Sequence, residues 1–456
     1  MKYFLQYLIY SFILLAQINF AQQFGKGLLL DDSLYVNSPI AAPLMRGDYS
    51  NLPEKYSLKE FAPTPGNQGS YSTCVGWASA YAARTILEAI RYKWNKREIN
   101  ENVFSPSFIY NQIRFEKNCS SGTSLLAGLE ILKKEGCEKL SEFTYDCNRN
   151  VNSKDSILAS KYRIIEYREI INSTTLDKTV FVKKSISNNR PVVIAMLCPP
   201  SFDRAGDLWQ PDKEEYKSNL FPGHALTIIG YDDNKYNGAF EIINSWGVNW
   251  GNKGFTWIKY SDFEVFCKLG FEVLDKDNIP ANVPDLSGEL NFRLSNEQPM
   301  KSHFNGRYFE MDKYYPAGTL FELRINNEEP AYVYAFSANN NFKTYKIFPF
   351  NEKMVAYLPY RQNNIAIPDE DHYNMIDTAE GKSYYVFLYS KVSLDIDKIM
   401  TGFEKESGTF YDKIISQLKG QMVDNDNIKI DDRGKIKFNA ISDGKEIVPI
   451  LVEFNK

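Results

Sequence analysis

Hydrophobic residues recur at helical spacing in two stretches of the first third of the chain. The first runs from about Cys74 to Trp94 and predicts a helix; its periodic apolar positions are Trp77, Ala78, Tyr81, Ala82, Leu87 and Ile90. The second predicts a helix from Thr123 to Lys134, which Gly136 ends. Both helices therefore precede the strand-like part of this region.

Continuous apolar runs follow the helices. Pro191 to Leu197 predicts a buried strand, and His224–Gly230, Ala239–Ile243 and Phe255–Lys259 predict three more. Helices early and strands late predict an α+β domain of two lobes.

The pattern changes after Asp275. A polar stretch with prolines and a glycine, residues 275–289, predicts a linker. Short alternating runs then predict a mainly antiparallel sandwich or barrel; they are Thr319–Asn326, Tyr332–Phe336, Lys343–Phe348 and Ser383–Tyr389. The tail predicts a helix near Tyr411–Leu418 and a hairpin of Lys435–Asn439 with Ile447–Phe454.

The N-terminus has the plan of a secretory signal peptide. Lys2 precedes an uncharged, mostly apolar stretch, Tyr3 to Phe20, and Ala21 offers a small residue for cleavage. The alternative is an uncut membrane anchor, because the stretch is close to the ~20 residues that a spanning helix needs. The favoured interpretation predicts an exported protein, secreted or periplasmic.

These patterns divide the chain into consecutive segments. We expect a signal peptide, a lead-in segment, an enzyme domain, a linker, a β-rich domain and a tail of helix plus hairpin that packs on the β-rich domain. Their bounds are 1–21, 22–51, 52–274, 275–289, 290–400 and 401–456.

Charge and cysteine content narrow the functional classes. The net charge of −4 argues against nucleic acid as a partner, because such binding needs a basic surface. Six cysteines in an exported chain suggest up to three disulfides. Cys137 and Cys147 are candidate partners, with Cys119 as a competitor. No metal site is expected, because there is no CxxC pair and there are three histidines.

Three segments carry candidate chemistry: Asn67 to Cys74, Gly223-His224-Ala225, and Asn244 to Gly251. A thiol nucleophile needs a lowered pKa, which a helix N-terminus at Cys74 and an imidazole such as His224 can provide. Asn244 is a candidate to orient that imidazole. The backbone N–H of Cys74 and the amide of Gln68 are candidate donors to an oxyanion.

Together these segments resemble the papain-like cysteine peptidases. Gln68 stands six residues before Cys74, and Asn244 opens the turn Asn-Ser-Trp-Gly-Val-Asn-Trp-Gly. His224 lies 150 residues after Cys74 and Asn244 lies 170 after it, close to the ~130–150 of that family. The resemblance covers roughly residues 52 to 270.

The resemblance implies a two-lobed papain-like fold and a role for each of these residues. Cys74 is the expected nucleophile, His224 the general base and acid, Asn244 the orienting residue and Gln68 the oxyanion donor. Trp246 would shield the His–Asn hydrogen bond from water. Gly122, in a segment similar to the family's Cys-x-Gly-Gly, would contact the substrate backbone. No cofactor is implied, and the implied substrates are proteins or peptides.

Several residues depart from the family pattern. Tyr71 stands where the family has a cysteine, so Cys119, which resembles that cysteine's partner, is expected to be free or paired elsewhere. Ser121 replaces one glycine. A long helical propeptide does not fit into residues 22–52, which argues against latency by a pro-domain, although the short lead-in could still lie across the cleft.

Two rival functions keep the same scaffold. The site could transfer an acyl group to an amine or cleave a non-peptide amide, or the scaffold could be catalytically silent and bind a partner. The region after residue 289 faintly resembles an uncharacterised β-domain of bacterial exported proteins. Its many tyrosines and phenylalanines fit a binding module for a protein, glycan or envelope partner, or a plain core. His303 and His372 lie in this region, and we expect them to be exposed to solvent.

Overall fold

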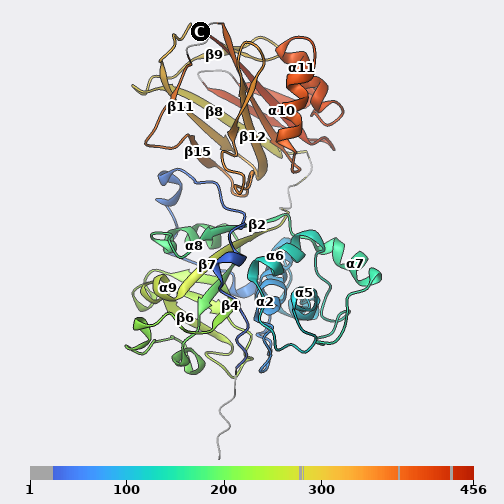
Figure 1. Ribbon diagram of the computed structural model, residues 1–456, viewed down its shortest axis with the longest axis vertical. Coiled ribbons are helices and arrows are strands. Elements are labelled where there is room, and N and C mark those ends of the chain that lie inside the picture. The colour runs from blue at the N-terminus through green and yellow to red at the C-terminus, as the bar shows by residue number, and fades with distance from the viewer. Residues whose placement is uncertain (1–23, 277–279, 281, 378–380, 432–434) are drawn as a thin grey trace, which may run out of the picture.

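The computed structural model describes residues 24–276, 280, 282–377, 381–431 and 435–456, so the predicted signal peptide lies outside the described residues. The described chain forms two bodies stacked along the long axis (Figure 1). The first holds the helices and one sheet up to Leu274, and the second is built mainly of strands from Leu286 onward. Within the described ranges, no helix is long and apolar enough to cross a membrane.

The helical lobe is centred on one long helix that begins at Cys74, as predicted. It consists of α2 (Cys74–Gly76), a π-helical segment η4 (Trp77–Arg84) and α3 (Thr85–Tyr92). The wider π turn frees backbone carbonyls, and the Thr227 hydroxyl donates to that of Ala78 at 2.9 Å. The surrounding helices are α4 (Lys96–Glu101), α5 (Pro106–Ile113), α6 (Leu125–Lys134) and α7 (Ser153–Ala159).

The second lobe is an antiparallel sheet in the order β2-β7-β3-β4-β5-β6, with β1 (Lys55–Ser57) paired to β4. Its strands are β2 (Glu166–Ile171), β3 (Val192–Leu197), β4 (Gly223–Asp232), β5 (Ala239–Ile243), β6 (Phe255–Lys259) and β7 (Cys267–Leu274). The helices α8 (Lys178–Ser187) and α9 (Tyr260–Phe266) belong to this lobe. The four predicted strands are β3 to β6. The two lobes confirm the predicted α+β class.

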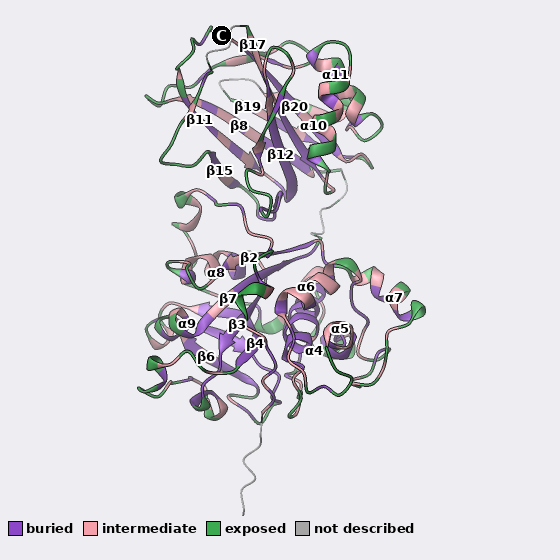
Figure 2. Cartoon of the chain, viewed as in Figure 1, coloured by how far each residue is buried: buried purple, intermediate pink, exposed green. Residues whose placement is uncertain are grey.

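The second body contains two sheets that share one hydrophobic core. One sheet has the order β13-β12-β17-β20-β10-β9, with β14 paired to β12, and the other β15-β11-β8-β19-β18, with β16 paired to β11. The core includes Leu290 and Ile325 of one sheet with Phe387 and Val452 of the other. Figure 2 shows these strands mostly buried. This arrangement is a sandwich, although β10 and β20 run parallel.

The strands of this body and its two helices have defined bounds. The strands are β8 (Leu286–Leu294), β9 (Ser302–Phe304), β10 (Phe309–Met311), β11 (Leu320–Asn327), β12 (Ala331–Ala338), β13 (Thr344–Phe348), β14 (Tyr357–Leu358), β15 (Asn363–Ile367), β16 (Asn374–Met375), β17 (Lys382–Ser390), β18 (Ile428–Asp431), β19 (Ile436–Ala440) and β20 (Ile447–Asn455). The helices are α10 (Ile396–Lys405) and α11 (Phe410–Leu418).

The structure differs from the sequence-based predictions for this body at three points. The predicted hairpin does not form, because β19 pairs with β8 and β18 in one sheet whereas β20 pairs with β17 and β10 in the other. Asp443-Gly444 therefore lies on a connection between sheets. Nothing in the sequence pattern predicted α10, whose buried residues are Ile396 and Phe403. Finally, β8 begins inside the predicted linker 275–289.

The lead-in segment, here residues 24–50, contacts both bodies. Figure 1 shows it in blue, rising between the two lobes of the first body toward the base of the sandwich. A buried polar cluster joins the bodies directly: the Tyr360 hydroxyl of the sandwich donates to Glu272 on β7, which also pairs with Arg168 on β2 at 2.7 Å. The two bodies therefore pack against each other through polar as well as apolar contacts.

Candidate active site

Cys74 lies at the junction of the two lobes. It is the first residue of α2, which packs against β4, and its side chain is fully buried. The backbone N–H groups of Ala225 and Gly27 lie near enough to its sulfur to lower the pKa of the thiol. Ala225 follows His224 on β4, so the structure brings the sulfur next to the strand that carries the predicted base.

The imidazole of His224 is oriented by Asn244, which follows β5. Their side chains form a buried hydrogen bond of 2.8 Å between Nε2 and Oδ1. Asn244 Oδ1 also accepts from the backbone N–H of Ser245 at 2.7 Å, which identifies it as the oxygen. Nε2 must therefore carry the proton. Nδ1 is then an unprotonated acceptor, and among the described residues it is buried without a hydrogen-bond partner.

Aromatic rings cover the His–Asn pair. The ring of Trp246 stacks on His224 with centroids 4.7 Å apart, and Phe24 of the lead-in segment stacks on the other part of Trp246 at 4.4 Å. Trp246 is 1% exposed. Gly247 ends this Asn-Ser-Trp-Gly turn with φ +78°, a backbone conformation that favours glycine. Trp246 therefore lies where it can shield the hydrogen bond between His224 and Asn244 from water.

Gln68 is fixed by Ser245, the residue after Asn244. Its Oε1 accepts from the Ser245 hydroxyl, and its backbone N–H donates to the Ser245 carbonyl at 2.8 Å. With Oε1 held in this way, Nε2 points at acceptors: it donates to the Tyr71 carbonyl at 2.6 Å and to the Gly25 carbonyl at 3.2 Å. The predicted oxyanion donor is therefore engaged by a carbonyl of the lead-in segment.

The lead-in segment fills the groove between the lobes. Leu28 donates to the Gly223 carbonyl at 3.2 Å, Leu29 donates to the Thr123 carbonyl at 3.0 Å, and Thr123 donates to the Gly27 carbonyl at 2.8 Å. Leu28 is 5% exposed and lies in the same hydrophobic cluster as Cys74, with Leu125 and Ala225. The groove thus already holds an extended peptide in the conformation described.

The register of this peptide explains why it can occupy the groove without being attacked. Attack requires one carbonyl to meet both the sulfur and the oxyanion donor. Here the carbonyl that accepts from Gln68 belongs to Gly25, whereas the lead-in group that lowers the pKa of the Cys74 thiol is the N–H of Gly27. An amide N–H is not an electrophile. The bound segment is therefore an occupant of the groove in a non-reactive register.

Burial disfavours the charged form of both predicted catalytic groups in this closed conformation. It raises the pKa of the Cys74 thiol, and the backbone hydrogen bonds from Ala225 and Gly27 offset this only in part. It lowers the pKa of His224 to about 4, against the opposing effect of the Asn244 hydrogen bond. The positive charge of Lys26, a lead-in residue, lowers it further. The thiolate–imidazolium pair expected of an active site is therefore unfavourable while the lead-in is bound.

We expect release of the lead-in segment to raise the pKa of His224. Its value of about 4 in the closed form lies below the ordinary 6.5, so protons bind the open or unfolded form first as the pH falls. The closed form should lose about 3 kcal/mol of stability as the pH falls from 6.5 through 4. NMR titration of the imidazole, one of three in the chain, measures this directly. A His224 pKa near 6.5 in the closed protein would contradict the account.

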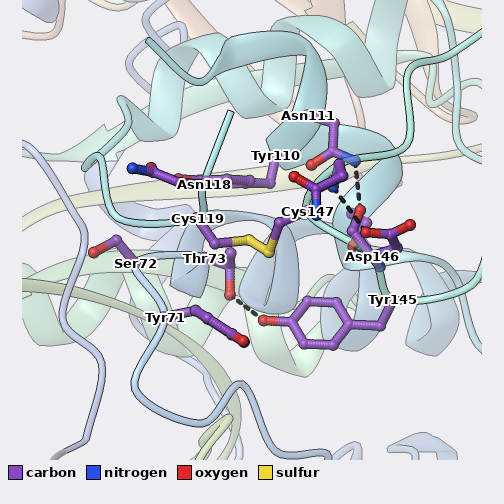
Figure 3. Close-up of a disulfide and its surroundings, with 12 residues drawn as sticks. Tyr71, Ser72, Thr73, Tyr110, Asn111, Asn118, Cys119, Tyr145, Asp146 and Cys147 are labelled. Atoms are coloured by element: carbon purple, nitrogen blue, oxygen red, sulfur yellow. Dashed lines mark hydrogen bonds between the residues drawn. A yellow bond between two sulfur atoms is a disulfide. The ribbon is translucent and has the colours of Figure 1, made fainter. Parts of the chain in front are cut away.

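One disulfide lies beside the site, between Cys119 and Cys147, with Cα atoms 5.4 Å apart (Figure 3). Cys119 is therefore re-paired, which the departure at Tyr71 left open. The six cysteines form this one disulfide, so the candidate pair Cys137–Cys147 is wrong and its competitor Cys119 is the partner of Cys147. Cys137 is instead buried in the helical core, with its sulfur on backbone carbonyls, and Cys74, Cys198 and Cys267 are also free thiols.

Tyr71 takes part in an aromatic cluster where the family has a cysteine. Its ring lies 6.4 Å from that of Tyr145, whose hydroxyl hydrogen-bonds to Thr73 at 2.8 Å (Figure 3). The Cys119–Cys147 bridge and this tyrosine pair therefore hold the loop before Cys74.

The remaining predicted sites have defined environments. Gly122 lies against the lead-in segment, since a Cβ there would meet Leu29 Cδ2 at 2.9 Å, but its neighbour Thr123 makes the backbone hydrogen bonds. His303 and His372 have exposed side chains, as expected, although each also pairs with an aspartate, Asp312 and Asp369. The described part of the chain contains no cluster of three or more potential metal ligands.

The sequence interpretation missed three residues that shape the site. Gly25 and Gly27 let the lead-in approach closely: a Cβ on Gly25 would lie 1.9 Å from the Tyr71 carbonyl oxygen, and one on Gly27 would lie 2.3 Å from that of Ser72. Ser245 was given no role, although its hydroxyl fixes Gln68. The Gly-Lys-Gly spacing was a usable signal, because glycines mark close backbone approach.

Comparison with known proteins agrees with this geometry. Residues 67–273 match the papain family cysteine protease family. The uncharacterized peptidase C1-like protein L477 of Acanthamoeba polyphaga mimivirus is 24% identical over 206 residues, which are 41% of this chain and 62% of that protein. Cathepsin K of Mus musculus is 24% identical over 231 residues, 48% of this chain and 63% of that protein.

The chain thus spans about six tenths of the length of these curated relatives. Among solved structures, xylellain, a cysteine protease from Xylella fastidiosa, is 22% identical with a TM-score of 0.46, covering 56% of this chain and 97% of that one. The match of the family to residues 67–273 includes Cys74, His224, Asn244 and Gln68. This chain therefore carries a papain-family cysteine protease domain over those residues.

Proposed function

We propose that the chain is a cysteine peptidase that hydrolyses peptide bonds through an acyl-enzyme. The observation that carries this proposal is the orientation of His224. Its Nε2 donates to Asn244, and its Nδ1 is an acceptor with no hydrogen-bond partner among the described residues. His224 precedes Ala225, whose backbone N–H lowers the pKa of the Cys74 thiol. Nucleophilic catalysis by a thiol requires an oriented, unprotonated imidazole nitrogen of this kind to take its proton.

The proposed reaction uses these groups in order. His224 Nδ1 takes the thiol proton, and the Cys74 sulfur forms a bond to the substrate carbonyl carbon. The oxyanion accepts hydrogen bonds from Gln68 Nε2 and the Cys74 backbone N–H. The C–N bond breaks as His224 returns the proton to the leaving amine, which leaves an acyl-enzyme. Water then adds to the acyl carbon as His224 takes its proton. The C–S bond breaks to release the acid, and His224 returns the proton to the Cys74 sulfur.

Two alternatives use the same scaffold. In acyl transfer an amine replaces water in the second half-reaction, and in a silent scaffold no acyl-enzyme forms. The presence of Cys74, His224, Asn244 and Gln68 in connected positions supports catalysis over a silent scaffold. The ratio of hydrolysis to transfer product in the presence of a peptide amine separates the first alternative from hydrolysis.

The segment in the groove also suggests the substrates. Leu28 is buried there among apolar side chains, which supports a preference for an aliphatic residue near the cleaved bond. Burying a leucine side chain is worth about 1.5–3 kcal/mol. In a positional peptide library we expect kcat/KM with leucine at the preferred position to exceed that with lysine by about 10- to 100-fold. Equal rates would contradict an apolar groove.

We also propose that the protein is exported. The apolar stretch Tyr3–Phe20 with Ala21 after it supports a cleaved signal peptide, and the Cys119–Cys147 disulfide fits an oxidising compartment. N-terminal sequencing of the natural protein should find a start at Gln22. A natural protein that retains Met1 would instead favour the uncut anchor.

A further inference from the structure

The lead-in segment contributes side chains to the cores of both bodies. Its first half belongs to the catalytic body, because Leu28 and Tyr35 are buried in the cluster that contains Cys74. Its second half belongs to the sandwich, because Ala42 and Leu44, 3% and 9% exposed, are members of the sandwich core. A segment that only closed the groove would have no need of the second set of contacts.

At residues 39 to 41 the segment pairs with both bodies at once. Ile40 donates to the Lys353 carbonyl at 2.9 Å and accepts from the Val355 N–H at 3.0 Å, both in the sandwich. The flanking backbone groups bond to Glu169 on β2 of the catalytic body: Ala41 donates at 3.1 Å, and the Pro39 carbonyl accepts at 2.7 Å. The segment is therefore an extended strand between the two bodies.

A second set of contacts to the sandwich follows. Met45 donates to the Asn364 carbonyl at 2.8 Å, and the Asp48 carboxylate accepts from both the backbone and the side-chain amide of Asn364, at 2.8 and 2.7 Å. Arg46 pairs with Asp371 and its N–H donates to Glu370. Residues 40 to 48 are thus fixed to one face of the sandwich by backbone, side-chain and apolar contacts.

A short connection joins this face to the groove. The Tyr35 hydroxyl donates to the Leu29 carbonyl at 2.7 Å and accepts from the N–H of Leu125 at the start of α6. Lys353 of the sandwich donates to the Val36 carbonyl. From Leu29 in the groove to Ile40 on the sandwich the chain has about 11 residues, and Tyr35 is attached near the middle.

We propose that the C-terminal sandwich is the anchor that keeps the lead-in segment in the catalytic groove, so that freeing residues 40–48 from the sandwich opens the groove. This inference depends on the proposed function in one respect, which is that the groove is the catalytic one. It gives the sandwich a role in controlling access to Cys74, and its partner at this surface is the chain's own N-terminal segment.

The anchor acts by shortening the loop that must close when the segment binds. With Ile40 fixed, that loop has about 11 residues. If residues 39–41 leave both the sandwich and Glu169, the next fixed points are the Tyr49 ring against Phe181 or the start of β1 at Lys55, which give about 20 to 26 residues. Loop closure scales with length to the power −3/2, so the groove-bound state should weaken by roughly 2- to 4-fold from this cause alone.

Hydrogen–deuterium exchange in full-length protein tests the anchor. The groove amides to follow are those of Gly25, Leu28 and Leu29, whose N–H groups are hydrogen-bonded across the groove. The first variant combines Leu44→Asp with Asp48→Ala. The second is Ile40→Pro, which removes one N–H and leaves the sandwich core intact. All are made in a Cys74→Ala background, so that self-cleavage cannot cut the segment. We expect exchange of the groove amides to rise roughly 2- to 4-fold.

The matched control is Lys435→Ala, which removes an ion pair with Glu289 elsewhere on the sandwich. This variant should leave amide exchange unchanged at residues 40–48 and at the groove amides. Faster exchange at residues 40–48 with unchanged groove amides would overturn the anchor, and so would no change at either place. The same anchor variants would also be made with Cys74 present and assayed for peptide hydrolysis. If their groove amides exchange faster but they never hydrolyse a peptide, the anchor is supported and the proposed function is refuted.

Discussion

Replacing Cys74 by alanine is expected to abolish peptide hydrolysis. The thiol is the group that would form the covalent intermediate, and removing the nucleophile of a comparable triad lowers kcat by roughly 10⁶-fold. Because Cys74 is fully buried and alanine is smaller, the fold should persist. The measurement is kcat on a leucine-containing peptide at neutral pH, with the lead-in displaced so that the groove is open.

Cys267→Ala is the matched control for this variant. Cys267 is also a free, fully buried thiol, but it lies at the start of β7, where its sulfur donates to the Leu269 carbonyl. Its loss should leave kcat within a few-fold of the parent. If Cys74→Ala hydrolyses the peptide as fast as Cys267→Ala does, the thiol is not the nucleophile.

Replacing Gly25 and Gly27 by alanine (Gly25→Ala/Gly27→Ala) is expected to activate the protein. Both glycines lie against the backbone of the loop before Cys74, and a Cβ at either would come within 2.3 Å of a carbonyl oxygen. Overpacking of this kind costs typically ~1–3 kcal/mol per site, which favours the open groove by about 5- to 150-fold for each glycine. The readout is the rate of Cys74 alkylation by a peptidyl electrophile, located by mass spectrometry.

Gly47→Ala supplies the control, because nothing lies within 4 Å of a Cβ at that position and its φ is not positive. In Gly47→Ala, the electrophile should alkylate Cys74 as slowly as it does in the parent protein. An unchanged labelling rate in Gly25→Ala/Gly27→Ala would show that the lead-in segment does not limit access to the thiol. The same double variant should also raise the pKa of His224 toward 6.5, since displacement removes both burial and the charge of Lys26.

The positions of the candidate catalytic residues were predictable because the proposed chemistry fixes both residue type and order. Cys74 at a helix start, His224 at the start of β4 and Asn244 in its turn all lie where the sequence pattern placed them. The strands β5 and β6 were predicted with their observed bounds, since each is a short apolar run with turn residues on both sides. Local signals were sufficient for these elements.

Non-local pairing was not predictable from local signals. β19 and β20 have the lengths and turn residues of a hairpin, and only the competing strands β8 and β17 decide that they enter different sheets. The π-helical segment depends on Thr227, far away in sequence, to satisfy the Ala78 carbonyl. The boundary predicted between residues 400 and 401 falls inside α10 (Ile396–Lys405). This helix has its apolar face over only a short length, so the sequence pattern did not reveal it.

The course of the lead-in segment was the largest gap. Its groove contacts are made mainly by backbone groups and by two glycines, which leave little trace in a hydrophobic pattern. No long helical propeptide was expected, and the alternative left open, that the short lead-in lies across the cleft, is what the structure shows, as an extended strand. Only the packing of two folded bodies against Ile40 shows why so short a segment is held there.

Trapping an acyl group on Cys74 tests the central claim most directly. Gly25→Ala/Gly27→Ala protein would be mixed with a leucine-containing peptide ester and quenched in acid within milliseconds, and digested for mass spectrometry. The account predicts the acyl mass on the peptide that contains Cys74, and its loss in His224→Ala. Hydrolysis that proceeds with no adduct on Cys74, or an open groove that forms neither adduct nor product, would contradict it.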